Sequence, residues 1–186
     1  EGRDGRAFAR LVSRHEGLLR RAAFVALGAA ARRDPGLVDD AVQEACVRLV
    51  DALARFRGEA SVATFMAAVA RRAALDELRK GLRRGAKAER AARLAAGGAS
   101  WRLDGEVAGS DPALSLERRE AGARVVELLA RLPEPERSIV YLRDAEGASL
   151  ADLARAFGLP EGTVKSKLAR ARAKLRGKAL AEWGNA

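Results

Sequence analysis

Cysteine and histidine are almost absent from this chain of 186 residues, which contains one of each, Cys46 and His15. A single cysteine excludes an internal disulfide framework, and one residue of each kind leaves no side-chain cluster that could hold zinc. No nucleophile is paired with a base, and no glycine loop suited to phosphate occurs. We therefore expect no catalytic residue, no cofactor and no metal. His15 falls on the apolar stripe of a predicted helix and is interpreted as a packing residue.

Long apolar runs are also missing. No run of eighteen apolar residues occurs, and the first residues lack the charged start, apolar core and cleavage site of a signal peptide. We expect a cytoplasmic protein without membrane insertion.

Aromatic residues make up only 4% of the chain, whereas alanine and leucine dominate its apolar share. This composition favours helix and predicts an all-α fold.

Acidic residues are fewer than basic ones. The chain has 25 aspartates and glutamates and 35 lysines and arginines, which gives a net charge of +10. Such an excess indicates a polyanionic partner, either nucleic acid or an acidic membrane surface.

The charge is divided along the chain. Residues 1–95 carry 20 basic and 12 acidic side chains, and residues 121–186 carry 12 and 8. Between these blocks, residues 96–113 are rich in glycine and serine and show no sustained apolar period, which is typical of a flexible linker. We predict two small helical domains, 1–95 and 114–186, joined by this linker.

Apolar spacing predicts three helices in the first domain, over about residues 6–27, 38–53 and 61–78, with Gly28 ending the first and Ser61 capping the third. The second has an outer face of mainly acidic and amide character, made of Asp40, Gln43, Glu44, Val47, Arg48 and Asp51. Two interpretations stay open for it, a solvated face or a protein-docking surface.

Between residues 71 and 93, nine basic side chains face three acidic ones. A run of this density is typical of a phosphate-contacting surface, although solubility alone also accounts for such runs.

The second domain shows helical spacing over residues 114–132, 135–147, 149–157 and 161–177. The first of these has its apolar spacing at Val125, Leu128, Leu129 and Leu132, and in the third Leu150, Leu153 and Ala154 are expected to face inward. Ser149 suits the N-cap of the third helix, and Gly158 permits a sharp turn before the fourth. Two helices joined in this way predict a helix-turn-helix, whose second helix enters the major groove of DNA. Its candidate DNA-contacting residues are Thr163, Lys165, Ser166, Lys167 and Arg170.

At residues 161–172, EGTVKSKLARAR resembles the recognition helix in region 4 of bacterial RNA polymerase sigma factors. The helix also resembles that of LuxR-type regulators, so a stand-alone helix-turn-helix regulator of that type is the alternative. The first domain favours the sigma factors, because DAVQE at 40–44, RFRGEAS at 55–61 and LDELR at 75–79 follow the order and spacing of region 2. The chain as a whole is similar to the extracytoplasmic-function (ECF) sigma factors of the sigma-70 family.

The resemblance implies a factor that binds core RNA polymerase and directs promoter-specific initiation. In the family, region 2 docks on the clamp of the largest subunit, and region 4 docks on the flap of the other large subunit. Asp40, Gln43, Glu44 and Arg48 match the clamp-binding positions. Promoter DNA is the second partner, and an anti-sigma factor is a further one that the resemblance allows.

The resemblance also assigns the promoter contacts. Region 2 recognises and melts the −10 element, and region 4 reads the −35 element through positions that match Lys165, Ser166 and Arg170, with Thr163 and Lys167 beside them. The loop from Phe56 to Ser61 would hold a flipped base. The −10 residues are Phe56, Gly58, Glu59, Ser61, Phe65, Arg71, Arg72, Arg79 and Lys80. Phe65 and Ala67 stand where the family usually has tryptophan or tyrosine.

Overall fold

The computed structural model describes residues 2–88, 125 and 127–183, and side-chain packing within residues 5–83, 125 and 127–177. Regular structure in these ranges is entirely helical, as predicted. The chain divides into two compact units, Glu1–Arg102 and Leu103–Ala186. The predicted linker at 96–113 and most of the helix predicted over 114–132 lie outside the described residues.

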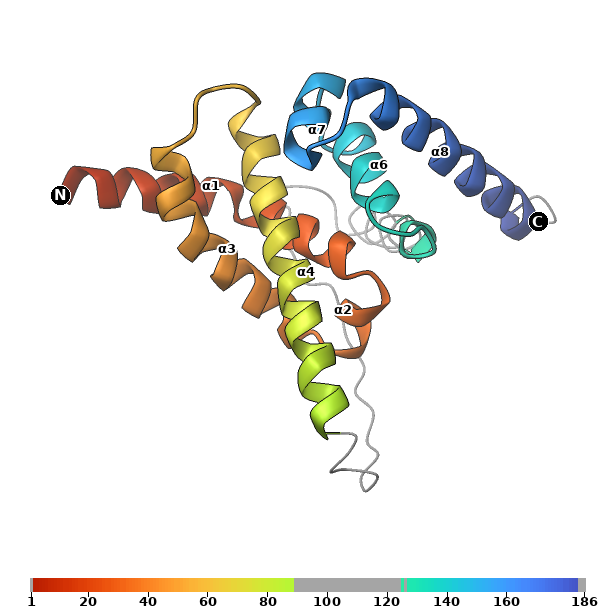
Figure 1. Cartoon of the computed structure of the whole chain (residues 1–186), viewed down its shortest axis with the longest axis horizontal. Helices are drawn as coiled ribbons and strands as arrows, with labels where there is room; N and C mark the ends of the chain where they lie inside the picture. The colour runs from red at the N-terminus through yellow and green to blue at the C-terminus, as the bar shows by residue number, and fades with distance from the viewer. Residues whose placement is uncertain (1, 89–124, 126, 184–186) are drawn as a thin grey trace, which may run out of the picture. The chain divides into compact units, whose positions relative to one another are not determined.

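Four helices make up the described part of the first unit (Figure 1). They are α1 (Gly2–Leu27), α2 (Ala29–Arg33), α3 (Gly36–Ala54) and α4 (Val62–Ala88). α4 packs against both α1 and α3, which also contact each other. Leu19, Leu49 and Met66 are fully buried at this meeting point. The three predicted helices are present, whereas the short α2 was not predicted, because five residues are too few to show a helical period.

Glycine and serine set the boundaries in this unit. Gly28, at φ 58°, lies between α1 and α2, so the first predicted helix ends where expected. The hydroxyl oxygen of Ser61 accepts a hydrogen bond from the backbone N–H of Thr64 at 3.1 Å. Ser61 therefore caps α4 as predicted, satisfying one of the donors that a helix start leaves without an intrahelical partner.

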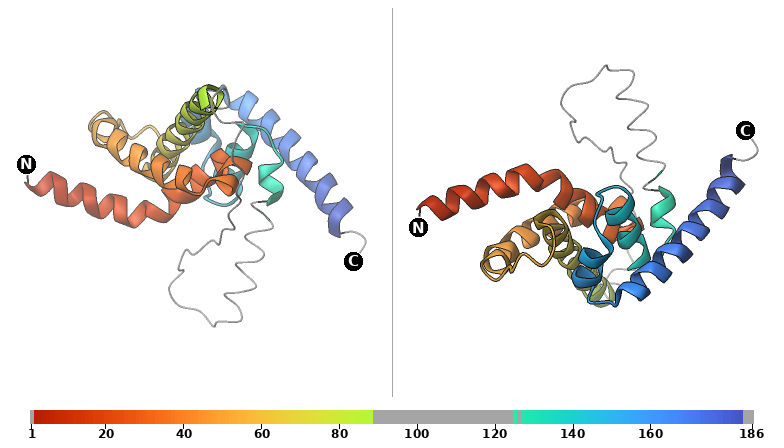
Figure 2. Two further views of the ribbon diagram at one scale, coloured as in Figure 1. Left: turned by 90° about the horizontal axis from the view of Figure 1, so that it is seen from below. Right: turned by 90° about the horizontal axis from the view of Figure 1, so that it is seen from above.

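The second unit contains a helical turn at 127–130, then α6 (Glu136–Asp144), α7 (Leu150–Phe157) and α8 (Glu161–Trp183). α8 packs against α6 and α7 and continues well beyond α7 (Figure 2). The core of the second unit includes the fully buried Leu132, Ile139, Leu153 and Val164.

Two helix ends in the second unit differ from the sequence prediction. α6 ends at Asp144 rather than near Gly147, and α8 runs to Trp183 rather than to about residue 177. Of the residues that carry the apolar spacing before α6, Leu128 and Leu129 are buried and Val125 is 51% exposed.

In the described part of the chain, no helix combines the length and the apolar character that crossing a bilayer requires.

Candidate functional site

α7 and α8 form the predicted helix-turn-helix, and the capping of α7 explains the tight turn. The Ser149 side chain accepts a hydrogen bond from the backbone N–H of Asp152 at 3.0 Å, which caps the start of α7. At its end Gly158 adopts the left-handed conformation (φ 63°, ψ 38°). The N–H of Leu159 donates to the carbonyl of Ala154, and the N–H of Gly158 donates to that of Arg155. This paired closure is a Schellman motif, in which glycine takes the left-handed conformation without steric cost.

One face of α8 packs inward and the opposite face is exposed. Val164, Leu168 and Ala171 are buried, as their spacing predicted. Among the candidate DNA contacts, Lys165, Ser166 and Arg170 are exposed, while Thr163 and Lys167 are half-buried.

The five candidate residues on α8 do not share one direction. At about 100° per residue, Thr163, Ser166, Lys167 and Arg170 fall on one side of the exposed face. Lys165 falls on the other side, about 160° from Lys167. The structure therefore brings four of the five together and separates Lys165 from them.

Two ion pairs fix α8 to α6. Arg172 pairs with Asp144, and the Nζ of Lys174 donates to the Oε2 of Glu136 at 3.1 Å. The hydrogen bonds that Arg172 donates to Asp144 raise the pKa of Arg172. These two basic residues hold the helix in place, whereas Arg170 makes a single long hydrogen bond, from its Nε to the carbonyl of Ser166 at 3.4 Å.

The loop before α4 brings two predicted −10 residues into contact. The rings of Phe56 and Phe65 lie with their centroids 4.7 Å apart and their planes at 39°, and both side chains are half-buried. Gly58 and Glu59 are exposed at the outer part of the loop, where Gly58 has φ 71°. The loop therefore presents an aromatic pair at its base and polar backbone at its outer end.

Farther along α4, the predicted −10 residues do not all share one side of the helix. Phe65, Arg72 and Arg79 recur every seven residues and so lie on one stripe of the helix. Arg71 lies about 100° away from Arg72 and is half-buried. The stripe is interrupted by an acidic residue, Asp76.

The outer face of α3 carries exposed apolar residues among polar ones. Val47 is 64% exposed and Val50 is 57% exposed. Asp40, Gln43 and Ala54 are also exposed, so this face repeats at intervals of 3, 4, 3 and 4 residues. This is the spacing by which one helix packs against another in a coiled coil.

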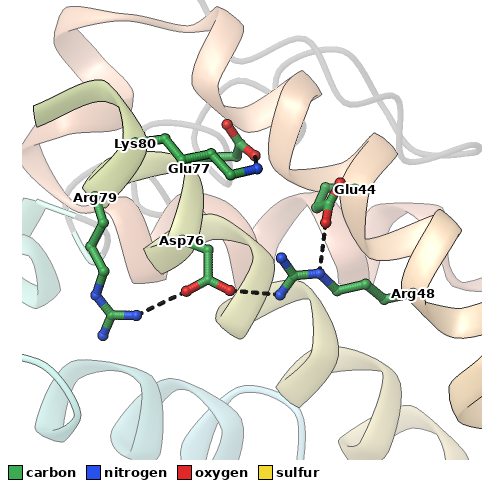
Figure 3. A network of polar contacts seen from close by, with 6 residues as sticks. All are labelled: Glu44, Arg48, Asp76, Glu77, Arg79 and Lys80. Atoms are coloured by element: carbon green, nitrogen blue, oxygen red, sulfur yellow. Dashed lines mark hydrogen bonds and ion pairs between the residues drawn. The ribbon is translucent and has the colours of Figure 1, made fainter. Parts of the chain in front are cut away.

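The remaining predicted docking residues, Glu44 and Arg48, take part in an ion network with α4 (Figure 3). Arg48 donates from Nε to Glu44 Oε1 at 2.8 Å and from Nη1 to Asp76 Oδ2 at 2.7 Å. Asp76 Oδ1 also accepts from Arg79 at 2.8 Å, and Lys80 donates to Glu77 at 2.7 Å. The charges of Arg79 and Lys80, predicted to hold a DNA strand, are thus balanced by neighbouring carboxylates.

The network shifts the pKa values of its members in consistent directions. The hydrogen bond from Arg48, supported by Arg79, lowers the pKa of Asp76, and the bond to Asp76 raises the pKa of Arg48. The bond to Glu77 raises the pKa of Lys80.

The sequence analysis assigned no role to Asp76. The spacing of Asp76 and Arg79 could have indicated their pairing, but the contact with Arg48 joins residues 28 positions apart.

The described residues offer no group of three or more histidine, cysteine or acidic side chains that could hold a metal ion. Cys46 is a free, half-buried thiol whose pKa is raised by burial and by the charge of Glu16.

Comparison with protein families matches both units. Residues 11–84 match the family described as Sigma-70 region 2, and residues 123–175 match Sigma-70, region 4. The chain is 34% identical over 172 residues to the ECF RNA polymerase sigma factor SigM of Mycobacterium tuberculosis, covering 92% of this chain and 76% of SigM. It is 32% identical over 141 residues to the ECF RNA polymerase sigma-E factor of Escherichia coli, covering 74% and 71%.

Solved structures give the same result for the fold. The structure of CnrH in complex with the cytosolic domain of CnrY is similar with a TM-score of 0.60 and 26% identity, covering 95% of this chain and 90% of that one. The sigma factor RpoE of Bartonella quintana, solved with the anti-sigma factor NepR, has a TM-score of 0.59 and 20% identity over 90% and 95% of the two chains.

Proposed function

Because the chain belongs to the ECF sigma factors, which direct transcription initiation, we propose that three separate surfaces carry out this function. The outer face of α3 binds the clamp of core RNA polymerase. The loop at 55–61 and the exposed stripe of α4 capture the −10 element. The exposed face of α8 reads the −35 element, while the second unit docks on the flap. The protein acts in the cytoplasm and carries out no catalytic step of its own.

The observation that carries this proposal is the outer face of α3. On a chain of net charge +10, this face combines acidic residues with the exposed Val47 and Val50 at coiled-coil spacing. Such a face suits a helical protein partner, because the apolar residues pack between side chains of the other helix and the polar ones surround them. A stand-alone regulator of the LuxR-like type has no need of this face, and the match to region 2 gives that alternative no support.

The two DNA surfaces are supported by their chemistry. On α8, Ser166, Lys167 and Arg170 share one side of a helix whose other side is buried, so donors face the groove together. In the first unit, the Phe56 and Phe65 rings offer the loop an aromatic surface on which a base can stack.

A protein of the anti-sigma type is a further proposed partner. In support, the similar structure of CnrH was solved with a protein partner, the cytosolic domain of CnrY.

Binding to core polymerase tests the proposal. We expect Val47→Arg to weaken the affinity of the purified chain for core polymerase at least ~10-fold, because it places a bulky charge at the centre of the contact. Ala9→Arg, the same addition at an exposed position of α1, is the matched control and should leave the affinity unchanged. Equal affinities for the wild type and Val47→Arg would exclude this face as the docking surface.

A further inference from the structure

Arg48 is held by carboxylates from two different helices. Its Nε bonds to Glu44, one turn earlier on α3, and its Nη1 bonds to Asp76 on α4 (Figure 3). About a third of the Arg48 side chain remains exposed. Two of its three guanidinium nitrogens are therefore bonded within the unit, and Nη2 remains with two hydrogens to donate.

The two carboxylates differ in how firmly they fix the arginine. Glu44 lies on the same helix, and a pair of this kind at a partly exposed site holds its partner weakly. Asp76 comes from α4, which packs along α3 through the core of the unit. The position of Asp76 is therefore set by helix packing, and the cross-helix bond fixes the direction of the guanidinium relative to the outer face of α3.

A fixed arginine has an advantage in binding. A long side chain loses much rotamer freedom when a partner immobilises it, and this loss weakens the complex. An arginine that is already oriented loses less rotamer entropy on binding. Its planar guanidinium can then donate to a carboxylate or a carbonyl of the partner without first changing rotamer.

We propose that Asp76 is a positioning residue for polymerase binding, which acts by holding Arg48 in the orientation that meets an acceptor on core polymerase. Asp76 itself lies on α4, outside the proposed docking face. The inference rests on the proposed function of the α3 face.

A double-mutant cycle tests the inference. The dissociation constant for core polymerase is measured with the full chain for the wild type, Asp76→Asn, Arg48→Ala and the double variant. Asparagine keeps the shape of the side chain and removes its charge. We expect Asp76→Asn to weaken binding about 5-fold when Arg48 is present and to change it less than about 2-fold when Arg48 is alanine.

An effect of Asp76 that does not pass through Arg48, for example through its second partner Arg79, gives a different result. Asp76→Asn would then weaken binding by the same factor in both backgrounds, and this outcome would overturn the inference. Asp76→Glu keeps the charge and should restore part of the affinity. Thermal unfolding of each variant, followed by circular dichroism, shows whether it is folded at the assay temperature.

Asp39→Asn is the matched control. Asp39 also forms an interhelical ion pair, with Arg20 of α1, but it does not touch Arg48. We expect this variant to bind core polymerase like the wild type, and a loss equal to that of Asp76→Asn would show that any lost ion pair has the same effect.

The possible failures can be told apart. If the wild-type chain does not bind core polymerase, the proposed function and the inference are both wrong. If the wild type binds and Asp76→Asn binds as tightly, the inference alone is wrong.

Discussion

Arg170 and Arg172 lie two residues apart on α8, yet the structure gives them different tasks. Arg170 is exposed and makes one long hydrogen bond, at 3.4 Å. Arg172 makes two hydrogen bonds to the carboxylate of Asp144 on α6. Replacing each with alanine should therefore produce two separable losses, one in promoter recognition and one in stability.

The sizes of these losses follow from the contacts. A bidentate contact between arginine and a base contributes ~1–3 kcal/mol of discrimination, so Arg170→Ala should lower the preference for the correct −35 sequence by roughly 5- to 150-fold. The Arg172–Asp144 pair is nearly half exposed, at 49% and 43%, so solvent screening limits its contribution to at most ~1 kcal/mol. For a domain of this size, that corresponds to a fall in Tm of no more than ~4–8 °C.

Two assays measure these effects. Competition binding of the holoenzyme to promoter fragments, with intact or substituted −35 sequences, gives the discrimination, and calorimetry gives the Tm. If Arg170→Ala weakened binding to all fragments equally, Arg170 would contact phosphate only. If Arg172→Ala left the Tm unchanged and abolished discrimination, the division of tasks between the two arginines would be wrong.

Three further predictions concern stability. Ser149→Ala removes the cap of α7 and should lower the free energy of unfolding by ~1 kcal/mol, measured by denaturant titration, whereas Ser149→Asp should retain most of it; equal losses in both would contradict a capping role. Leu153→Ala leaves a cavity at a fully buried position and should lower the same quantity by ~2–5 kcal/mol, and a loss below ~1 kcal/mol would refute the packing described. The pKa of Asp76 is lowered by Arg48 and then by Arg79, so its stabilising effect is complete above its unfolded pKa of ~4 and disappears as the pH falls through the folded pKa. The difference in unfolding free energy between the wild type and Asp76→Asn should therefore shrink on acidification, and a difference independent of pH would contradict this.

Helix positions could be predicted because their signals are local. Apolar spacing placed the buried residues of α3 and α8, and Ser61 and Ser149 cap helices by bonds that reach only three residues along the chain. The ends of α6 and α8 show the limit of this reasoning, because apolar spacing alone did not place either of them correctly.

The candidate site was predicted less completely, because its geometry depends on contacts between helices. Sequence reasoning placed Arg48 on an outer face but could not detect its bond to Asp76, 28 residues away. Arg79 and Lys80 each pair with an acidic residue three positions earlier, a spacing that permits ion pairs on a helix. The sequence analysis considered only the excess of basic residues in this segment and did not predict these pairs. On α8, the separation of Lys165 from Lys167 follows from helix geometry once the buried face is known.

Reconstituted transcription tests the central claim most directly. Core polymerase is incubated with genomic DNA from the source organism, with and without the purified chain, and the 5′ ends of the transcripts are mapped. The account predicts discrete start sites that require the chain, share sequences near −10 and −35, and disappear with Val47→Arg. Start sites that are the same with and without the chain would contradict it.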